Sequence, residues 1–376
     1  MFWFIVITIG LILLAFIILR VGYIWLNTWV RKPDADYVLK FIQENPERSS
    51  LSVVRNGEVV AALQDNFLRP LASTVKTILG IEYAKQAASG AIDPAERVAL
   101  DDLTAFYVPN TDGGAHGAWL RSIEEGGLVT HGRVALAEVA KGMLAYSSNA
   151  NTEYLMMRLG LDRINANLES LQLSRHEPLY PFVSSLFIPY ELWQRLGTDL
   201  PKKEALDRVK KQLHQMTPND FAAEAEAIHE KLKNDRDGSY KKTAALSEWF
   251  DNEFDRLHSV KFTKATTAEY VSLMQKLNSR TYFPPDVQSH LDTIFEWPMQ
   301  QENNAEQYRH LGGKGGSTAY MLTQALYAED NAGNKTELAV FFYDILGYET
   351  SKLKHSIDAF LKKVLIDETF RGQLRG

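Results

Sequence analysis

Strand-like segments lie near both ends of this 376-residue chain, and the sequence between them has helical patterning. Near the start, residues 50–55 and 58–63 alternate on either side of an Asn-Gly pair, the strongest short-range signal for a β-hairpin. Near the end, residues 318–328 and 336–343 read as two more strands, separated by a turn, and Lys314 to Ser317 open the first of them. Early and late strands with helices between them predict an α+β fold, in which both chain ends build one antiparallel sheet packed against helices.

The middle of the chain predicts an all-helical subdomain. A helix is expected from Ser73, shortly after Pro70, to about Ser89. Residues 135–160 read as two helical runs broken at residues 146–149. Residues 203–258, which are dense in alternating charge, read as two or three amphipathic helices, with a capped helix start at Thr217-Pro218. Further helices are expected at residues 34–48, 265–277 and 351–365.

The first 30 residues predict a transmembrane anchor that is separate from the folded body at residues 34–376. Phe2 to Leu19 is apolar or small throughout apart from one threonine, which is nearly enough helix to cross a hydrocarbon core of about 30 Å. Trp25 and Trp29 follow at the level of an interfacial aromatic belt. A cleaved signal peptide is the rival interpretation, but the segment lacks a basic start and a small-residue cleavage site.

Charge and chemistry disagree about the orientation of this anchor. Arg20, Arg31 and Lys32 all follow the apolar run, which by the positive-inside rule places the body in the cytoplasm. The chemistry of the motifs described below favours the outside. We therefore expect an extracytoplasmic body, at the periplasm or the cell surface, in conflict with the charge bias.

Composition excludes several classes of function. The formal net charge of −6 argues against a nucleic-acid partner, because binding phosphates requires clustered Lys and Arg. The chain has no cysteine, which excludes thiol catalysis and cysteine-based zinc sites. Its histidines do not form the close pairs typical of metal ligands, so neither a metal nor another cofactor is expected.

Three Ser-x-x-Lys sequences occur in the chain, starting at Ser73, Ser239 and Ser351, so the spacing alone is weak evidence for catalysis. The last two lie in charged, amphipathic segments. The first opens a mostly apolar helix, where Lys76 shares a helix face with Ser73. A buried ammonium group loses its charge readily, which makes Lys76 a candidate proton acceptor for a Ser73 nucleophile.

Two further motifs follow in order, Ser147-Ser148-Asn149 and Lys314-Gly315-Gly316. The ordered set Ser-x-x-Lys, Ser-x-Asn and Lys-Thr-Gly resembles that of the penicillin-recognising serine hydrolases, and most closely of class A β-lactamases. Other segments add to the resemblance: RPLASTVK at 69–76, AFYVP at 105–109, the Arg-x-Glu-Pro at 175–178 and TTAEYVSLMQKL at 266–277. The resemblance implies the fold of β-lactamases and transpeptidases.

The resemblance also implies roles for individual residues. Ser73 would be the nucleophile, Lys76 its proton acceptor, Ser147 the proton relay to the leaving nitrogen and Glu177 the activator of the deacylating water. The substrate-binding residues would be Tyr107, Asn149, Lys314, Gly316 and Ser317, with the backbone N–H groups of Ser73 and Ser317 forming the oxyanion hole. Glu177 also fits an ordinary loop carboxylate, and Tyr107 an ordinary core residue.

Three departures from the family pattern weaken the expectation of rapid β-lactam turnover. Gly315 stands where the family usually has a Thr or Ser hydroxyl. Pro181 stands where an Asn usually helps to place the deacylating water. No Arg follows Gly316 on the next strand to hold a substrate carboxylate.

The sequence therefore leaves three functions open. The first is a membrane-anchored class A-type enzyme that forms an acyl-enzyme on Ser73 and hydrolyses β-lactams. The second is a related acyl-serine enzyme that acts on cell-wall peptides or small esters with little β-lactam turnover. The third is a non-catalytic, membrane-tethered binding module. Residues 189–259 exceed the family pattern and are expected to form a helical insertion in the body.

Overall fold

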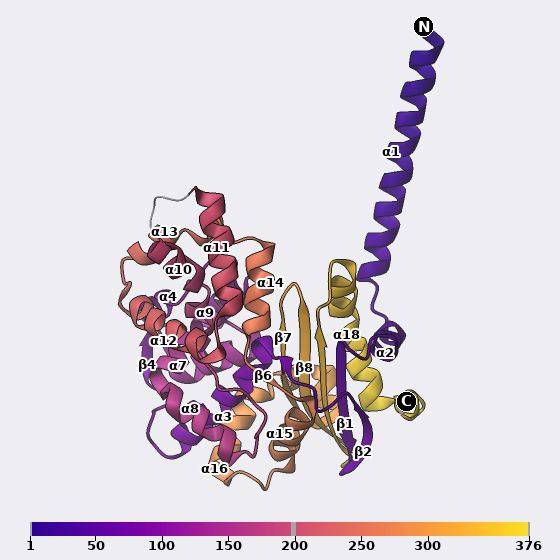
Figure 1. Ribbon diagram of the computed structural model, residues 1–376. Coiled ribbons are helices and arrows are strands. Elements are labelled where there is room, and N and C mark those ends of the chain that lie inside the picture. The colour runs from indigo at the N-terminus through magenta and orange to yellow at the C-terminus, as the bar shows by residue number, and fades with distance from the viewer. Residues whose placement is uncertain (1, 197–200, 375–376) are drawn as a thin grey trace.

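The computed structural model describes residues 2–196 and 201–374 and consists of a mixed lobe, a helical lobe and one projecting helix (Figure 1). The mixed lobe holds a five-stranded sheet with the order β2-β1-β9-β8-β7, in which all neighbouring strands are antiparallel. Its strands are β1 (Ser49–Arg55), β2 (Glu58–Leu63), β7 (Tyr308–Ser317), β8 (Met321–Asp330) and β9 (Lys335–Tyr343). The predicted α+β fold with a sheet made by both chain ends is confirmed.

The predicted hairpin forms β1 and β2, with Asn56 in the left-handed region at its turn. One strand prediction is wrong. Lys314 to Ser317 were expected to open a strand, but they end β7, and residues 318–320 turn the chain into β8. The glycines of this segment have low β-propensity, so the segment reads as a loop until its pairing with β8 is known.

Helices cover the two faces of the sheet. On one face, α2 (Ala35–Glu44) and α18 (Tyr348–Ile366) pack an apolar cluster that includes Leu338, Val340 and Phe360. On the other face lie α15 (Thr267–Ser279) and the helical lobe, which bury Ala325, Tyr327 and Phe341. The shorter strands β3 (Arg69–Pro70) and β6 (Lys264–Ala265) pair with each other, as do β4 (Arg97–Ala99) and β5 (Arg133–Ala135).

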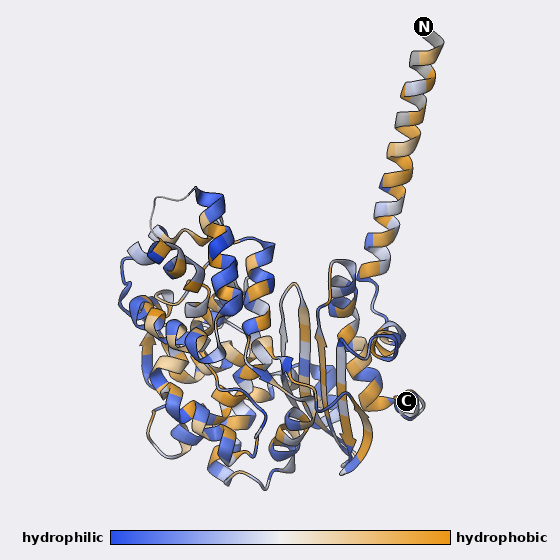
Figure 2. Ribbon diagram, viewed as in Figure 1, coloured by the Kyte–Doolittle hydropathy of each residue, from blue (hydrophilic) through white to orange (hydrophobic). Residues whose placement is uncertain are grey.

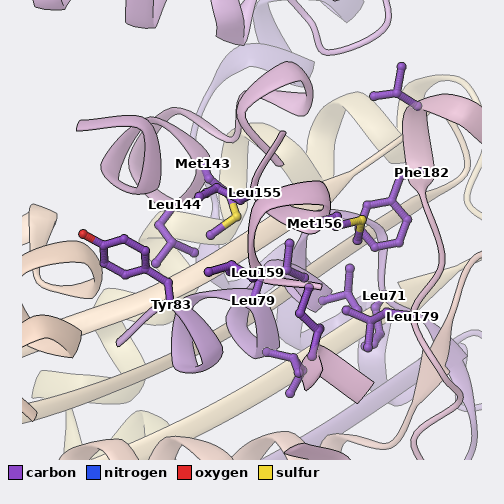
Figure 3. Packing of buried hydrophobic residues seen from close by; sticks show 14 of the residues in the cluster. Leu71, Leu79, Tyr83, Met143, Leu144, Leu155, Met156, Leu159, Leu179 and Phe182 are labelled. Carbon is purple, nitrogen blue, oxygen red and sulfur yellow. The ribbon is translucent and has the colours of Figure 1, made fainter. Parts of the chain in front are cut away.

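The helical lobe surrounds α3 (Lys76–Ala88), which is buried along nearly its whole length. Figure 3 shows Leu79 and Tyr83 of α3 packed among apolar side chains that include Leu155 and Leu159 of α7. The other helices of this lobe and its borders are α4 (Leu100–Thr104), α5 (Ala115–Glu125), α6 (Leu136–Lys141), α7 (Asn149–Leu159), α8 (Leu161–Ser170), α9 (Phe182–Ser185), α10 (Ile188–Leu196), α16 (Pro285–Phe295) and α17 (Glu302–Gln307).

The charged segment at 203–258 forms four helices, where two or three were predicted. They are α11 (Lys202–Gln215), α12 (Pro218–Asn234), α13 (Ser239–Ala244) and α14 (Asn252–Lys261). The predicted helix start at Thr217 is confirmed, because its hydroxyl accepts a hydrogen bond from the Asp220 N–H at 3.2 Å. Residues 1, 197–200 and 375–376, which fall within the predicted anchor, insertion and body, lie outside the described residues.

Helix α1 (Phe2–Arg31) projects away from both lobes and is apolar along most of its length (Figure 2). Residues 7–31 are long and apolar enough to cross a bilayer. Its last turn is held to the body by α18, where the Lys352 ammonium donates to the carbonyl oxygens of Trp29 at 2.9 Å and Lys32 at 2.7 Å. The Lys352 ammonium also lies 4.8 Å from the Trp29 ring centroid. The end of α1 is therefore docked on the mixed lobe.

Candidate active site

Ser73 lies in a short 3-10 helix (Ala72–Val75) that leads directly into α3. The α-helix thus begins at Lys76, three residues after the predicted start. Ala72 has a φ of +45°, a left-handed conformation that costs a non-glycine residue free energy and that clusters at functional sites. The Thr74 hydroxyl bonds that of Thr323 on β8 at 2.7 Å, so the turn is tied to the sheet. Ser73 is partly exposed at the start of a buried helix.

Lys76 is buried, with 1% of its surface exposed. Its ammonium donates to the Ser147 carbonyl oxygen at 2.7 Å, to Asn149 Oδ1 at 2.9 Å and to Ser147 Oγ at 3.3 Å. No hydrogen bond to Ser73 is present in the described part of the chain. Burial, and then the nearby charge of Lys314, lower the pKa of Lys76 well below its usual value. The neutral, proton-accepting form is therefore within reach at a lower pH than for an exposed lysine.

Ser147 and Asn149 lie where two helical segments meet, as the predicted break required. A π-helical turn (Gly142–Tyr146) ends at Ser147, which adopts a left-handed φ of +69°, and Ser148 then caps α7. The Ser148 hydroxyl accepts from the Asn151 N–H and bonds His116 Nδ1 at 2.9 Å. Single π-turns inside helices are frequently found at functional sites. This junction directs Ser147 and Asn149 to Lys76.

Lys314 approaches the same serine from the sheet. Its ammonium donates to Ser147 Oγ at 3.0 Å and to the Gly315 carbonyl oxygen at 2.8 Å. Burial lowers the pKa of Lys314 to about 7. The hydroxyl of Ser147 consequently accepts hydrogen bonds from two lysines that belong to different lobes.

Gly316 allows the end of β7 to touch the Ser73 turn. A Cβ atom at position 316 would overlap the backbone nitrogen of Ser73 and lie 2.9 Å from that of Thr74. Only glycine permits this approach, which brings the exposed end of β7 at Ser317 next to the 3-10 helix.

Seven of the nine predicted site residues line one cavity of about 1140 Å³ between the lobes. They are Ser73, Lys76, Ser147, Asn149, Lys314, Gly316 and Ser317. Sequence reasoning did not single out Asp112 and Gln324, which also line this cavity. Gln324 lies along the cavity because β8 pairs with β7, and this pairing has no signal in the sequence.

The structure does not place Glu177 or Tyr107 along this cavity. Glu177 is held by β6, because its N–H donates to the Lys264 carbonyl at 2.8 Å and its Oε2 accepts from the Lys264 N–H at 3.0 Å. The Tyr107 ring packs at 4.8 Å from that of His116 and against the core of the helical lobe. Both positions match the alternatives noted from the sequence, a loop carboxylate and a packing residue.

Metal chemistry has no obvious location in the described residues. Across residues 2–196 and 201–374, no three His, Asp or Glu side chains gather as a potential metal site.

The model of the beta-lactamase enzyme family matches residues 35–247, which is more than half of the chain. The chain belongs to the beta-lactamase enzyme family. It is thus a member of the penicillin-recognising serine hydrolase superfamily, and the resemblance stated from the motifs is confirmed. No protein in the curated set that was compared matches the chain.

Solved β-lactamases share the fold at low identity. The structure aligns with a beta-lactamase from Sphaerobacter thermophilus at a TM-score of 0.51 and 14% identity, over 88% of this chain and 95% of that one. It aligns with a beta-lactamase from Chitinophaga pinensis at a TM-score of 0.50 and 11% identity, over 87% and 98% of the two chains. At these identities the likeness concerns the fold alone.

Proposed function

We propose that this family member is a membrane-anchored serine hydrolase that forms an acyl-enzyme on Ser73. The observation that carries the proposal is the buried Lys76 ammonium, whose pKa is lowered and which lines the same cavity as Ser73. A serine needs an adjacent base to attack a carbonyl, and a desolvated lysine is one of the groups that supply it. Contacts between nucleophile and base are often long without substrate and close in the complex.

The proposed acylation step involves the hydrogen bonds that Lys76 and Lys314 donate to Ser147. Neutral Lys76 takes the proton of Ser73 Oγ as this oxygen attacks the carbonyl carbon, and the N–H groups of Ser73 and Ser317 stabilise the developing oxyanion. The carbon–nitrogen bond then breaks, and the leaving nitrogen takes its proton from Ser147 Oγ. Lys76 returns the proton to Ser147 along the 3.3 Å hydrogen bond between them. Lys314 stabilises the negative charge that develops at Ser147, and Asn149 binds the substrate amide.

Deacylation is proposed to be slow. The Glu177 carboxylate accepts a hydrogen bond from the Lys264 backbone and does not line the cavity, so it is poorly placed to activate a water molecule there. Pro181 precedes α9 and supplies no side-chain donor to hold such a water. These observations favour the second of the three functions, an acyl-serine enzyme that acts on cell-wall peptides or small esters. β-Lactams would acylate this enzyme, and the acyl group would be released slowly.

The location that fits this activity is the outer face of a membrane. Helix α1 would anchor the body, and cell-wall peptides and β-lactams are both encountered outside the cytoplasm. The basic residues that follow the span argue for the opposite orientation. A reporter fused after residue 376 resolves this: activity only in the cytoplasm would overturn the placement.

Labelling of the full chain in detergent micelles tests the proposed chemistry. A fluorescent penicillin should give a stable adduct that Ser73→Ala abolishes, while nitrocefin turnover should stay slow. Rapid nitrocefin turnover would instead support efficient β-lactam hydrolysis. No Ser73-dependent labelling by penicillins or by a general acyl-serine probe would leave only the non-catalytic binding module.

A further inference from the structure

The side chain of Gln324 fills the space that a side chain at position 315 would occupy. Gln324 lies on β8 directly opposite Gly315 on β7, and paired residues of antiparallel strands project to the same face. A Cβ atom at position 315 would lie 2.5 Å from Gln324 Nε2 and 2.7 Å from its Cδ. The glycine therefore leaves room for the carboxamide, which lies over Gly315 on the edge strand β7.

The carboxamide of Gln324 lies in the cavity wall with its polar atoms unused. The side chain is half-buried and lines the cavity that also holds Ser73. Among the described residues, neither its oxygen nor its nitrogen has a hydrogen-bond partner within the protein. A partly buried amide gains free energy when it is hydrogen-bonded, so a ligand that reaches this wall would satisfy both a donor and an acceptor.

The cavity wall around this amide has no net positive charge, because its four lysines are balanced by four aspartates. The cavity wall has no arginine, and Lys76 and Lys314 are engaged by Ser147, Asn149 and Gly315. Two other lysines of the wall, Lys354 and Lys362 on α18, form no ion pair in the described part of the chain and are balanced only in formal charge, by Asp255 and Asp358 of the same wall. An unpaired carboxylate is costly to remove from water, whereas an amide, ester or hydroxyl group can pair with a carboxamide at no charge cost.

We infer that Gln324 determines substrate specificity by binding a neutral hydrogen-bonding group of the substrate where a carboxylate would otherwise lie. The substrate class is then an acyl compound that carries an amide, ester or hydroxyl group at the edge of β7, beyond the carbonyl that Ser73 attacks. This inference rests on the proposed acylation of Ser73.

The test compares two β-lactams that differ in one charge, benzylpenicillin and its methyl ester. The rate of Ser73 acylation is measured on the full chain in detergent micelles by intact-protein mass spectrometry. The wild type should react about tenfold faster with the ester than with the acid, the factor that one unpaired charge or hydrogen bond is expected to contribute. Gln324→Arg supplies a cation and should reverse this preference, and Gln324→Ala should abolish it.

Gln324→Glu is the matched control, because it keeps the shape of the side chain and adds a negative charge. It should slow the acid further, and it should slow the ester about as much as Gln324→Ala does, because a carboxylate cannot donate a hydrogen bond to the ester oxygens. A wild type that prefers the acid, or an unchanged ratio in both Gln324→Arg and Gln324→Ala, would overturn the inference while leaving acylation intact. If neither compound forms a Ser73-dependent adduct, the proposed function itself fails, and the inference fails with it. If Gln324→Arg does not fold, the ratio of ester to acid reactivity in Gln324→Ala, compared with that of the wild type, tests the inference.

Discussion

At the scale of single residues, the site depends on two lysines that share one hydroxyl. Lys76 and Lys314 both donate to Ser147 Oγ, and both are almost completely buried. Burying ammonium groups destabilises a fold, and active sites commonly retain such costs because the chemistry requires them. The two lysines should therefore matter for reactivity more than for stability.

Replacing Lys76 by methionine separates these two effects. Lys76→Met keeps the volume of the side chain and removes the proton acceptor, so we expect acylation by a fluorescent penicillin to slow by at least about a hundredfold. The melting temperature should stay the same or rise, since a desolvated ammonium is removed. A variant that labels at the wild-type rate would exclude Lys76 as the base.

The lowered pKa of Lys314 predicts how stability depends on pH. The folded protein releases this proton near pH 7, whereas the unfolded chain keeps it until the usual lysine value of 10.5. Between these values the unfolded state binds more protons, so the free energy of unfolding rises with pH. Lys314→Met lacks this pH-dependent contribution. From pH 7.5 to 9, the free energy of unfolding of the wild type should rise by up to about 1.4 kcal/mol per pH unit relative to that of Lys314→Met.

Urea denaturation of both proteins at pH 6, 7.5 and 9 provides the measurement. Below pH 7 both states of the wild type hold the proton, so the difference between the two proteins should level off. Parallel stability curves over the whole range would show that Lys314 titrates at its ordinary value and is not buried as described.

At the scale of elements, the contact between β7 and the 3-10 helix brings Ser73 to the sheet. Gly316→Ala places a methyl group against the backbone nitrogen of Ser73, which cannot move as a side-chain end can. We expect the labelling rate to fall by at least about tenfold, with a loss of about 1–3 kcal/mol in the free energy of unfolding. Gly372→Ala is the control, because a methyl group there meets no atom within 4 Å. Equal labelling by the two variants would contradict the described contact.

A second element-scale prediction concerns Gly315 and Gln324. The three atoms nearest to a Cβ atom at position 315 all belong to the end of the Gln324 side chain, which can swing aside. Gly315→Thr should therefore change the ratio of acid to ester reactivity in the same direction as Gln324→Ala. The double variant should show less than the sum of the two single effects, since both remove the same amide from the cavity. Additive effects in the acylation rates would contradict this coupling.

Local signals in the sequence predicted the elements that local interactions specify. The Asn-Gly hairpin, the cap at Thr217 and the break before Ser148 all involve neighbours in the chain, and all are found. Glycine-rich β7 was misread, because its strand conformation comes from pairing with β8 rather than from its own residues.

The same difference between local and long-range interactions applies to the residues of the candidate site. The ordered motifs identified the seven residues that meet in the cavity, since each motif carries its own spacing. The place of Glu177 depends on the pairing of its loop with Lys264, a contact 87 residues apart in the chain. The place of Gln324 depends on strand register. Neither long-range arrangement can be deduced from a short motif.

At the scale of the whole molecule, α1 and the mixed lobe are joined by a specific clamp. Lys352 caps the end of α1, and the Ser356 hydroxyl accepts from the Asp34 N–H at 3.2 Å in the segment between α1 and α2. The orientation of the body relative to α1 is therefore set by α18 rather than left to a flexible linker.

Lys352→Ala should loosen this joint without altering the site. We expect limited proteolysis near residues 31–34 to be about tenfold faster, because unprotected backbone is cut more readily, while penicillin labelling stays at the wild-type rate. His355→Ala, on the exposed side of the same helix, is the control. Unchanged cleavage in Lys352→Ala would show that the clamp does not hold α1.

The central claim is that Ser73 becomes acylated and stays acylated, and intact-protein mass spectrometry after incubation with benzylpenicillin tests it most directly. The wild type should gain the mass of one whole penicillin molecule, the adduct should map to Ser73 and persist for many minutes after the free drug is removed, and Ser73→Ala should show no gain. A wild type that never gains this mass would contradict the account, whether or not it consumes the drug. So would an adduct that forms equally in Ser73→Ala.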